Sequence, residues 1–380
     1  MADRLLKYRD RFPILKQSAY LASHSLGAMS QEVREELAAY TDAWDTLGVR
    51  AWQDGWWELP ITVGDELAPI LGAPPGSVAM FPNVTLAEGV VASCFSFQPP
   101  RNRVVLSELD FPSVQYLWHP VPGAEVVTVP SQDGLTVETD DLLKAIDERT
   151  AVVPISHVLF RSGFLQDIPA ISARAREVGA RVVLDCYQSA GVLPFSLVDL
   201  QVDFAVGGSV KWLCGGPGAG WLYVRHDLQQ ELEPRLVGWQ ADREPFAFRS
   251  GRIQYAGGMW RFLNGTPNVP GLHAARAGYR MIQEVGVEPI RDKSLWMTQW
   301  IIDMAHELDI PVTSEREPKR RGGTVTLGLP DEATVASALA EEGVIVDSRP
   351  EAGVRVGPHF YNSEDDLARL RKKLIRLLGL

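Results

Sequence analysis

Two stretches, RVVLDCYQSAG (residues 181–191) and DFAVGGSVKWLCGGPGAGWLYV (residues 203–224), carry the clearest structural pattern in the chain. Each contains a short apolar run; the first run ends at Asp185, and the second leads through a glycine-rich turn to Lys211. Apolar, β-branched runs of this length, when helices link them, are typical of a parallel sheet covered on both faces. Because ligands gather at the carboxyl ends of such strands, we expect Asp185 and Lys211 to reach one crevice.

Similar apolar runs alternate with helical patterns on both sides of these stretches, as in an α/β fold. The strands that we predict lie at residues 103–107, 125–129, 151–156, 181–185, 203–206, 218–224, 323–328, 344–348 and 353–356. For the run at 218–224, an antiparallel place at the edge of the sheet is one alternative. The predicted helices lie at residues 30–46, 61–71, 86–96, 168–178, 270–284 and 289–308 and from Ser363 onward.

The pattern of predicted elements changes after about residue 250, where long helical patterns precede short strands. This change favours two domains of unequal size. We predict a large ligand-binding domain over residues 15–250. A smaller α+β domain would contain residues 1–14 and 251–380, with a cleft between the two.

Composition and charge restrict the class of protein. The 380 residues carry a formal net charge of −11, which argues against a general attraction to nucleic acid or to an anionic membrane. No run of about 18 apolar residues is present, so we expect no membrane span. The three cysteines, Cys94, Cys186 and Cys214, have no metal-ligand spacing and form no even set of disulfides. Together with a charged amino-terminal stretch unlike a secretory signal, this predicts a cytoplasmic protein without a metal site.

An acid and an amine that face one ligand suit pyridoxal 5′-phosphate (PLP). Its aldehyde forms an imine with a lysine that sheds its proton near neutral pH, and a carboxylate keeps the pyridine nitrogen protonated. Lys211 and Asp185 would fill these roles, although each alone could be a surface lysine or a helix-capping aspartate. Gln188, three residues after Asp185, could hydrogen-bond the ring hydroxyl oxygen or cap a helix.

The segment PNVTLAEG (residues 82–89) indicates a phosphate site. Asn83, Val84 and Thr85 lie at the start of a predicted helix, where free backbone N–H groups and the helix dipole favour an anion. An ordinary N-cap formed by Asn83 or Thr85 explains the same residues. Both interpretations stay open at this point.

Assembled in order, these motifs resemble the class V aminotransferase superfamily of fold-type I PLP enzymes, and within it the kynureninase family. The opening YLASHSLGAMS (residues 20–30) is similar to the YLxxNSLG opening of kynureninases. The resemblance implies a mainly parallel, seven-stranded sheet between helices, a smaller carboxy-terminal α+β domain, and an enzyme that acts on a small L-amino acid. The other motifs that carry it are WQDGWWELP (52–60), LDFPSVQY (109–116), VVLDCYQSAG (182–191), GGSVKWLCGGPG (207–218), VGW (237–239) and GVRVGPHFYNS (353–363).

The resemblance assigns roles around the cofactor. Lys211 would carry PLP and move a proton at the substrate Cα, Asp185 would pair with the pyridinium nitrogen, and Gln188 with the ring hydroxyl. Phe111 would stack on the cofactor ring, unless it is an ordinary core residue. The residues that would hold the phosphate are Val84 (through its N–H), Thr85 and Ser209.

The resemblance also assigns residues to the substrate and to a second subunit. Arg355 would clamp the α-carboxylate with paired hydrogen bonds, although a solvated strand residue is the alternative. His24 and Ser25 are candidate substrate contacts or turn residues. Thr266 resembles a threonine that reaches the cofactor phosphate of a neighbouring subunit, and Trp239 resembles another residue of that cofactor site contributed at the same boundary. Both imply a homodimer with shared active sites.

Three positions depart from the kynureninase pattern. Gln188 replaces a histidine, Val114 replaces an acidic residue, and Val210 replaces a tyrosine that helps to bind phosphate and is implicated in proton transfer. Loss of a phenol and a carboxylate removes proton-handling groups, whose help is typically worth about 10²–10⁴-fold. The desulfurase branch fits poorly as well, because its nucleophilic cysteine precedes the arginine, and VDSRPEAGVR (residues 346–355) contains none.

Other unusual residues admit two interpretations. The four tryptophans within residues 44–57 could line an entrance for an aromatic substrate or pack against a dimer partner, and we favour the partner. His157 could approach the cofactor or be a structural histidine. Cys186 and Cys214 flank the cofactor motifs, but small packing residues explain them more simply.

Three hypotheses for function follow. The first is a kynureninase-like hydrolase or lyase that cleaves a side-chain bond. The second is another class V reaction, namely transamination, epimerisation or β-elimination at a C–S bond, because the same cofactor chemistry serves all of them. The third is a non-catalytic PLP-binding scaffold. The joint presence of Lys211, Asp185 and Arg355 argues against it, since a scaffold needs no carboxylate clamp.

Overall fold

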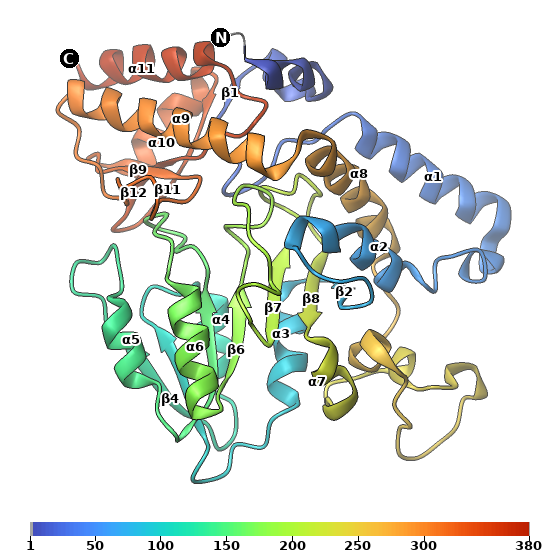
Figure 1. Cartoon of the computed structure of the whole chain (residues 1–380). Helices are drawn as coiled ribbons and strands as arrows, with labels where there is room; N and C mark the ends of the chain where they lie inside the picture. The colour runs from blue at the N-terminus through green and yellow to red at the C-terminus, as the bar shows by residue number, and fades with distance from the viewer. Residues whose placement is uncertain (1–2, 380) are drawn as a thin grey trace.

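A seven-stranded sheet forms the centre of the computed structural model, which describes residues 3–379 (Figure 1). In order across the sheet, the strands are β2 (Val78–Phe81), β8 (Gly220–Val224), β7 (Phe204–Gly208), β6 (Arg181–Asp185), β5 (Thr150–Ser156), β3 (Arg103–Ser107) and β4 (Glu125–Val129). Strands β7, β6, β5, β3 and β4 pair in parallel, whereas β8 is antiparallel to both of its neighbours. The predicted α/β fold with a mainly parallel sheet is confirmed.

The antiparallel strand β8 lies one place inside the edge of the sheet, not at the edge itself. The edge is β2, a four-residue strand that the sequence analysis did not predict, because it is short and follows a Pro-Pro-Gly turn. Helix α2 (Leu59–Leu67) packs tightly on it: a Cβ on Gly64 would lie 2.3 Å from the carbonyl oxygen of Val78. Packing with a distant helix, rather than a local pattern, therefore defines this edge.

Both faces of the sheet are buried, which explains why its strands are apolar throughout. Alternate residues of β6 belong to separate hydrophobic clusters, Val182 and Leu184 to one and Val183 to the other, as the strand period of two requires. The helices that contribute to the cluster of Val183 are α3 (Val84–Ser93), α4 (Pro112–Trp118) and α7 (His226–Glu231). Those of the opposite cluster are α2, α5 (Thr139–Ala145), α6 (Ile168–Val178) and α8 (Val269–Val285), and α1 (Glu32–Leu47) packs against α8.

The carboxy-terminal part of the chain, orange to red in Figure 1, gathers at one end of the molecule. It builds an antiparallel sheet in the order β11 (Asp347–Arg349), β12 (Gly353–Val356) and β9 (Val325–Leu327). Helices α9 (Val287–Glu307), α10 (Glu332–Glu341) and α11 (Glu364–Leu378) share a hydrophobic cluster with this sheet. Ser363 caps α11 in a capping box, so the helix begins where the sequence predicts.

The predicted strand at residues 344–348 is divided into β10 (Val344–Ile345) and β11, and β10 pairs in parallel with β1 (Ala19–Tyr20). This pairing joins residues 19–20 to the carboxy-terminal part, so the division of the chain near residues 15 and 250 stays a prediction. The remaining short 3-10 helices are η1 (Arg4–Arg11), η2 (Pro13–Lys16), η3 (Gly48–Trp52), η4 (Ala68–Leu71), η5 (Trp239–Ala241), η6 (Pro245–Ala247) and η7 (Gly258–Phe262).

Two further observations concern membranes and metals. Across residues 3–379, no helix has both the length and the apolar character needed to cross a bilayer. Within the same residues, no group of three or more histidine, cysteine, aspartate or glutamate side chains could hold a metal ion. The three cysteines are free thiols.

Candidate active site

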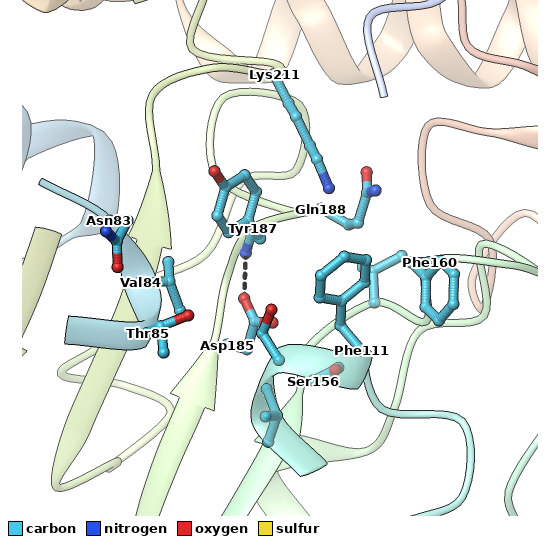
Figure 2. Close-up of a pocket in the computed structure, with 13 residues that line it drawn as sticks. Asn83, Val84, Thr85, Phe111, Ser156, Phe160, Asp185, Tyr187, Gln188 and Lys211 are labelled. Atoms are coloured by element: carbon cyan, nitrogen blue, oxygen red, sulfur yellow. Dashed lines mark hydrogen bonds between the residues drawn. The ribbon is translucent and has the colours of Figure 1, made fainter. Parts of the chain in front are cut away.

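A cavity of about 230 Å³ lies at the carboxyl ends of β5 and β6 and beside the turn that follows β7. The predicted cofactor residues that line it are Val84, Thr85, Phe111, Asp185, Gln188 and Lys211. They come from four separate segments of the chain, and Figure 2 shows them around one space. The parallel sheet thus brings together most of the residues that the motifs indicated. We call this space the first cavity.

Asp185 and Lys211 both face the first cavity but do not pair with each other. Asp185 is the last residue of β6; it is buried, and one carboxylate oxygen accepts a hydrogen bond from the Tyr187 N–H at 2.8 Å (Figure 2). Among the described residues, no ion pair or hydrogen bond engages the Lys211 amine, which lies over aromatic rings instead. Burial lowers the pKa of Lys211 to about 7 and raises the pKa of Asp185. A ligand therefore has room between an amine and an acid.

Aromatic and aliphatic side chains form the walls of the first cavity. The Lys211 Nζ atom lies 4.4 Å from the centroid of the Tyr187 ring and 5.7 Å from that of Phe111. Phe160 meets Phe111 edge to face, with ring centroids 5.1 Å apart, and Val114 also lines the space. These walls keep water from the amine, which explains its lowered pKa, and they suit a flat aromatic ligand.

The amino terminus of α3 forms one end of the first cavity. The Asn83 side chain accepts a hydrogen bond from the Leu86 N–H at 2.9 Å, so Asn83 is the N-cap that the sequence left as an alternative. This cap leaves the N–H groups of Val84 and Thr85 without a partner inside the helix, and both residues line the cavity. A helix cap and a place for an anion therefore coexist here.

The groups around this space match the groups of PLP one by one. An unpaired amine with a lowered pKa suits the aldehyde, and a buried carboxylate suits the ring nitrogen. The apolar walls suit the faces of the ring. The free N–H groups at the start of α3 suit the phosphate. The residues present therefore fit the cofactor.

Gln188 is partly engaged by the protein. Its side-chain oxygen accepts a hydrogen bond from the Trp212 indole at 3.0 Å, and its amide nitrogen donates to the His24 carbonyl oxygen at 3.1 Å. One amide N–H remains for a ring hydroxyl oxygen. The two contacts hold the amide in place at the wall of the first cavity.

Ser209 does not join the other predicted phosphate contacts. It is fully buried and is absent from the lining of the first cavity. Its hydroxyl group is hydrogen-bonded to the Tyr279 hydroxyl at 2.5 Å and donates to the Ala219 carbonyl oxygen at 2.7 Å. Tyr279 belongs to α8, and its contact engages the Ser209 hydroxyl group that the motif assigned to the phosphate.

Arg355 is only 2% exposed and is already paired. It donates to both carboxylate oxygens of Asp347, from Nε at 2.9 Å and from Nη2 at 2.6 Å, and from Nη1 to the Phe160 carbonyl oxygen at 2.8 Å. His24 is also buried, and its Nε2 is hydrogen-bonded to Asp347 at 2.8 Å. Neither Arg355 nor His24 lines the first cavity. The predicted carboxylate clamp is thus held by an internal carboxylate, and His24 supports that carboxylate.

The ionisation of this cluster follows from its burial. Burial lowers the pKa of His24 to about 4, so the ring is neutral near pH 7. Burial opposes ionisation of Asp347 as well, but the hydrogen bonds from His24 and Arg355 outweigh it and lower the pKa of Asp347. Asp347 and Arg355 are therefore both charged at neutral pH, and each satisfies the other.

The other predicted contacts lie outside the first cavity. Ser25 sits in a turn, with its N–H donating to the Ala22 carbonyl oxygen. Trp239 and Thr266 line a second cavity of about 450 Å³, which shares no lining residue with the first. Trp57 packs edge-on against Trp239 there, with ring centroids 4.7 Å apart. A role of Trp239 and Thr266 across a dimer boundary stays a prediction.

For His157, Cys186 and Cys214, which had two interpretations, the surroundings favour a structural role. His157 is buried outside the lining of the first cavity, with Nδ1 hydrogen-bonded to Ser189 Oγ at 3.0 Å, and burial lowers its pKa to about 4. Cys186 and Cys214 are buried too. Burial raises the pKa of Cys186 well above its usual value and that of Cys214 to about 12, which suits packing residues rather than nucleophiles.

Sequence reasoning missed three residues that shape the site. Tyr187 and Phe160 follow β6 and β5, so the rule that ligands bind at the carboxyl ends of parallel strands could have found them. Asp347 lies directly opposite Arg355 in the β11–β12 pair. A cross-strand pair of opposite charges was therefore the available signal, once the two short strands were aligned.

Comparisons with known proteins agree with this geometry. The family model described as Aminotransferase class-V matches residues 62–370. Kynureninase of Bacillus mycoides (strain KBAB4) is 29% identical over 98% of this chain and 92% of its own length, and kynureninase of Bacillus anthracis is 30% identical over 96% and 89%. The uncharacterized aminotransferase YcbU of Bacillus subtilis (strain 168) is 30% identical over 95% of both chains.

Solved structures share the fold over almost the whole chain. Cysteine desulfurase of Thermococcus onnurineus NA1 matches with a TM-score of 0.88 at 21% identity and covers 98% of both chains. The cystine C-S lyase C-DES, in complex with cysteine persulfide, matches with a TM-score of 0.85 at 21% identity, over 96% of this chain and 98% of its own. At these identities the likeness shows the fold alone. Because the family model spans most of the chain and full-length relatives reach 30% identity, this chain belongs to the class-V aminotransferase family of PLP-dependent enzymes, as a kynureninase-like member.

Proposed function

We propose that this chain holds PLP in the first cavity through Lys211 and cleaves a side-chain bond of a small L-amino acid, in the manner of a kynureninase. One observation carries the proposal: the Lys211 amine and the buried Asp185 carboxyl group line one cavity, and no hydrogen bond or ion pair among the described residues joins them. Burying such groups without partners costs free energy, so this arrangement is expected where a ligand completes it.

The residues of the first cavity would divide the chemistry among them. When bound, PLP supplies an acceptor for the electrons released as the substrate Cα loses its proton. Lys211 would take that proton and return it, and a pKa of about 7 leaves its amine able to do both near neutral pH. Asp185 would keep a proton on the ring nitrogen, and Phe111 would cover the ring. The N–H groups of Val84 and Thr85 would bind the phosphate.

Arg355 would bind the substrate α-carboxylate. Asp347 and the Phe160 carbonyl group use three of its five N–H donors, so two remain. Because Asp347 holds the guanidinium in one orientation, an incoming carboxylate would meet donors that are already placed. The Phe160 ring lines the first cavity, which puts Arg355 close behind its wall.

Another class V reaction is the second candidate: transamination, epimerisation or β-elimination. Val114 favours it, because the wall of the first cavity is apolar where kynureninases carry an acid. Val210 favours it too, since the phenol that precedes the lysine in kynureninases is missing. A non-catalytic scaffold is disfavoured, because the pair at the cavity and the arginine behind it are all present.

Release of fluorescent anthranilate from L-kynurenine tests the proposal. Protein loaded with PLP should be yellow and should release anthranilate, and Lys211→Ala should lose both properties. Lys144→Ala, which changes an exposed lysine, should keep both. If the wild type binds PLP without releasing anthranilate, while other amino acids change its absorption spectrum, the second candidate replaces the first. A wild type that stays colourless with added PLP would overturn both.

We further infer a cytoplasmic homodimer with a PLP-binding domain over residues 15–250 and a small domain from residues 1–14 and 251–380. Trp239, Phe246 and Phe248 are exposed beside the second cavity, and large exposed apolar groups mark interfaces. The three free thiols suit a reducing compartment. Light scattering after size exclusion should give twice the mass of one chain, and a monomer at micromolar concentration would contradict the dimer.

A further inference from the structure

Tyr187 reaches into the first cavity from the loop that follows β6 (Figure 2). Its ring lies 4.4 Å from the Lys211 amine, and it lines the same space as Val84 and Thr85. Among the hydrogen bonds formed by residues 3–379, none engages its hydroxyl group, although its backbone N–H is used by Asp185. The Tyr187 side chain is therefore placed to contact a ligand in the first cavity, and its hydroxyl group is available for a hydrogen bond.

Two facing glycines bring the Tyr187 hydroxyl group close to the start of α3. Gly208 of β7 and Gly220 of β8 are directly opposite each other in the antiparallel ladder. A Cβ on Gly208 would lie 2.5 Å from the Tyr187 Oη atom, and a Cβ on Gly220 would lie 2.8 Å from the Cα atom of Asn83. Side chains of directly opposite residues point to one face, about 4.5–5.5 Å apart. The phenol and the N-cap of α3 therefore occupy neighbouring places on the same face of the sheet.

We propose that the Tyr187 hydroxyl group donates a hydrogen bond to the phosphate of the bound cofactor, and so replaces the phenol that is missing at position 210. The inference rests on the proposed function and adds one donor to the N–H groups of Val84 and Thr85. The ligand group is a phosphate monoester, which carries negative charge at neutral pH. Gly208 is needed for this position of the Tyr187 side chain, because a Cβ atom at residue 208 would collide with the phenol.

The ionisation of Tyr187 suits a donor. Burial raises its pKa to about 12, so the hydroxyl group stays protonated near neutral pH. A hydrogen bond to a charged phosphate oxygen is stronger than one between neutral groups. Ser209, the hydroxyl that the motif indicated for the phosphate, is engaged by Tyr279 and lies outside the lining of the first cavity, whereas Tyr187 lines it.

Tyr187→Phe tests the proposal, because it keeps the ring beside the Lys211 amine and removes only the hydroxyl group. In equilibrium titrations of the cofactor-free protein, we expect the variant to bind PLP about 10- to 100-fold more weakly than the wild type does. Pyridoxal, which lacks the phosphate, should bind both proteins equally well. Inorganic phosphate should raise the melting temperature of the cofactor-free wild type more than that of the variant. Tyr116→Phe, an exposed tyrosine, is the matched control and should change none of these values.

The outcomes separate this inference from the proposed function. If Tyr187→Phe leaves PLP affinity unchanged, or weakens PLP and pyridoxal equally, the phenol does not bind the phosphate and the inference is wrong. A wild type that binds no PLP refutes the proposed function instead. Gly208→Ala should weaken PLP binding as Tyr187→Phe does, and the combined variant should be no weaker than either one. Losses that add would also overturn the inference.

Discussion

The first cavity differs in how its charges are paired from the cluster of Arg355, Asp347 and His24 behind its aromatic lining, which we call the wall. In the cavity, the half-buried Lys211 amine has no hydrogen-bond or ionic partner among the described residues, and the buried Asp185 carboxyl group has no charged partner there. In the wall, Arg355 is bonded to Asp347, which is bonded in turn to His24. A buried charge without a partner costs stability, and breaking a buried pair is strongly destabilising because it leaves such a charge behind. The cavity thus offers an amine and an acid to a ligand, whereas the charges of the wall are paired before a ligand arrives, with two N–H donors of Arg355 left over.

Lys211→Ala should have the largest effect, on catalysis and on attachment of the cofactor, without lowering stability. We expect turnover of the amino-acid substrate to fall by roughly 10²–10⁴-fold or more, because the proton-transfer group is lost. The cofactor-free variant should be at least as stable as the wild type, since the substitution removes a half-buried amine that has no hydrogen-bond or ionic partner among residues 3–379. Initial rates and urea unfolding measure the two effects, with Lys144→Ala as the exposed control. Wild-type turnover, or a clearly lower urea midpoint, would contradict the contrast between the two regions.

The pH dependence of the Lys211 amine is the next largest effect. Below pH 7 the amine is protonated and unreactive, so the rate at which cofactor-free protein captures pyridoxal should rise through pH 7 and then level. An ordinary lysine, with a pKa near 10.4, would be about 10³-fold less reactive at neutral pH. Absorbance measured across this range gives the profile. A rate that continues to climb toward pH 10 would show that burial does not depress the pKa.

Asp347→Ala, in the wall, should lower stability, unlike Lys211→Ala in the first cavity. The buried Arg355 would lose its counter-charge, and we expect the free energy of unfolding to fall by about 3–5 kcal/mol. Urea unfolding of the cofactor-free protein measures the change, and Asp141→Ala, at an exposed ion pair, should cost less than about 1 kcal/mol. The double change Asp347→Ala with Arg355→Met should recover most of the loss. If Asp347→Ala unfolds at the wild-type midpoint, the pair in the wall is not a closed unit.

Asp185→Asn should have the smallest effect on stability, and its sign is the informative part. Burial raises the pKa of Asp185, so its ionised form is disfavoured in the folded protein, and this penalty is present at neutral pH and lost in acid. The cofactor-free variant should therefore be more stable at pH 7 by roughly 1 kcal/mol, and the gain should vanish in acid as the wild type becomes protonated. Thermal unfolding at the two pH values measures it. A less stable variant at pH 7 would mean that the Asp185 carboxylate has a charged partner in the cofactor-free protein.

Contiguous residues carried most of the information about the fold. The strands β3 to β8 and the turn to Lys211 follow from apolar runs and glycines that are local in the chain. The edge strand β2 escaped prediction because its position depends on α2 and β8. Asp185 and Lys211 were found because strand ends are a local feature, and the carboxyl ends of parallel strands meet at one crevice.

The amino-acid sequence alone specified an α/β sheet, a kynureninase-like family and an amine and an acid at neighbouring strand ends. Packing in three dimensions selected which polar groups remain free. Ser209 is taken by Tyr279, 70 residues away, and Arg355 by a carboxylate that His24, 323 residues from it, also holds. A side chain's residue type sets what it can donate or accept, but only the folded chain brings its partner within hydrogen-bonding distance.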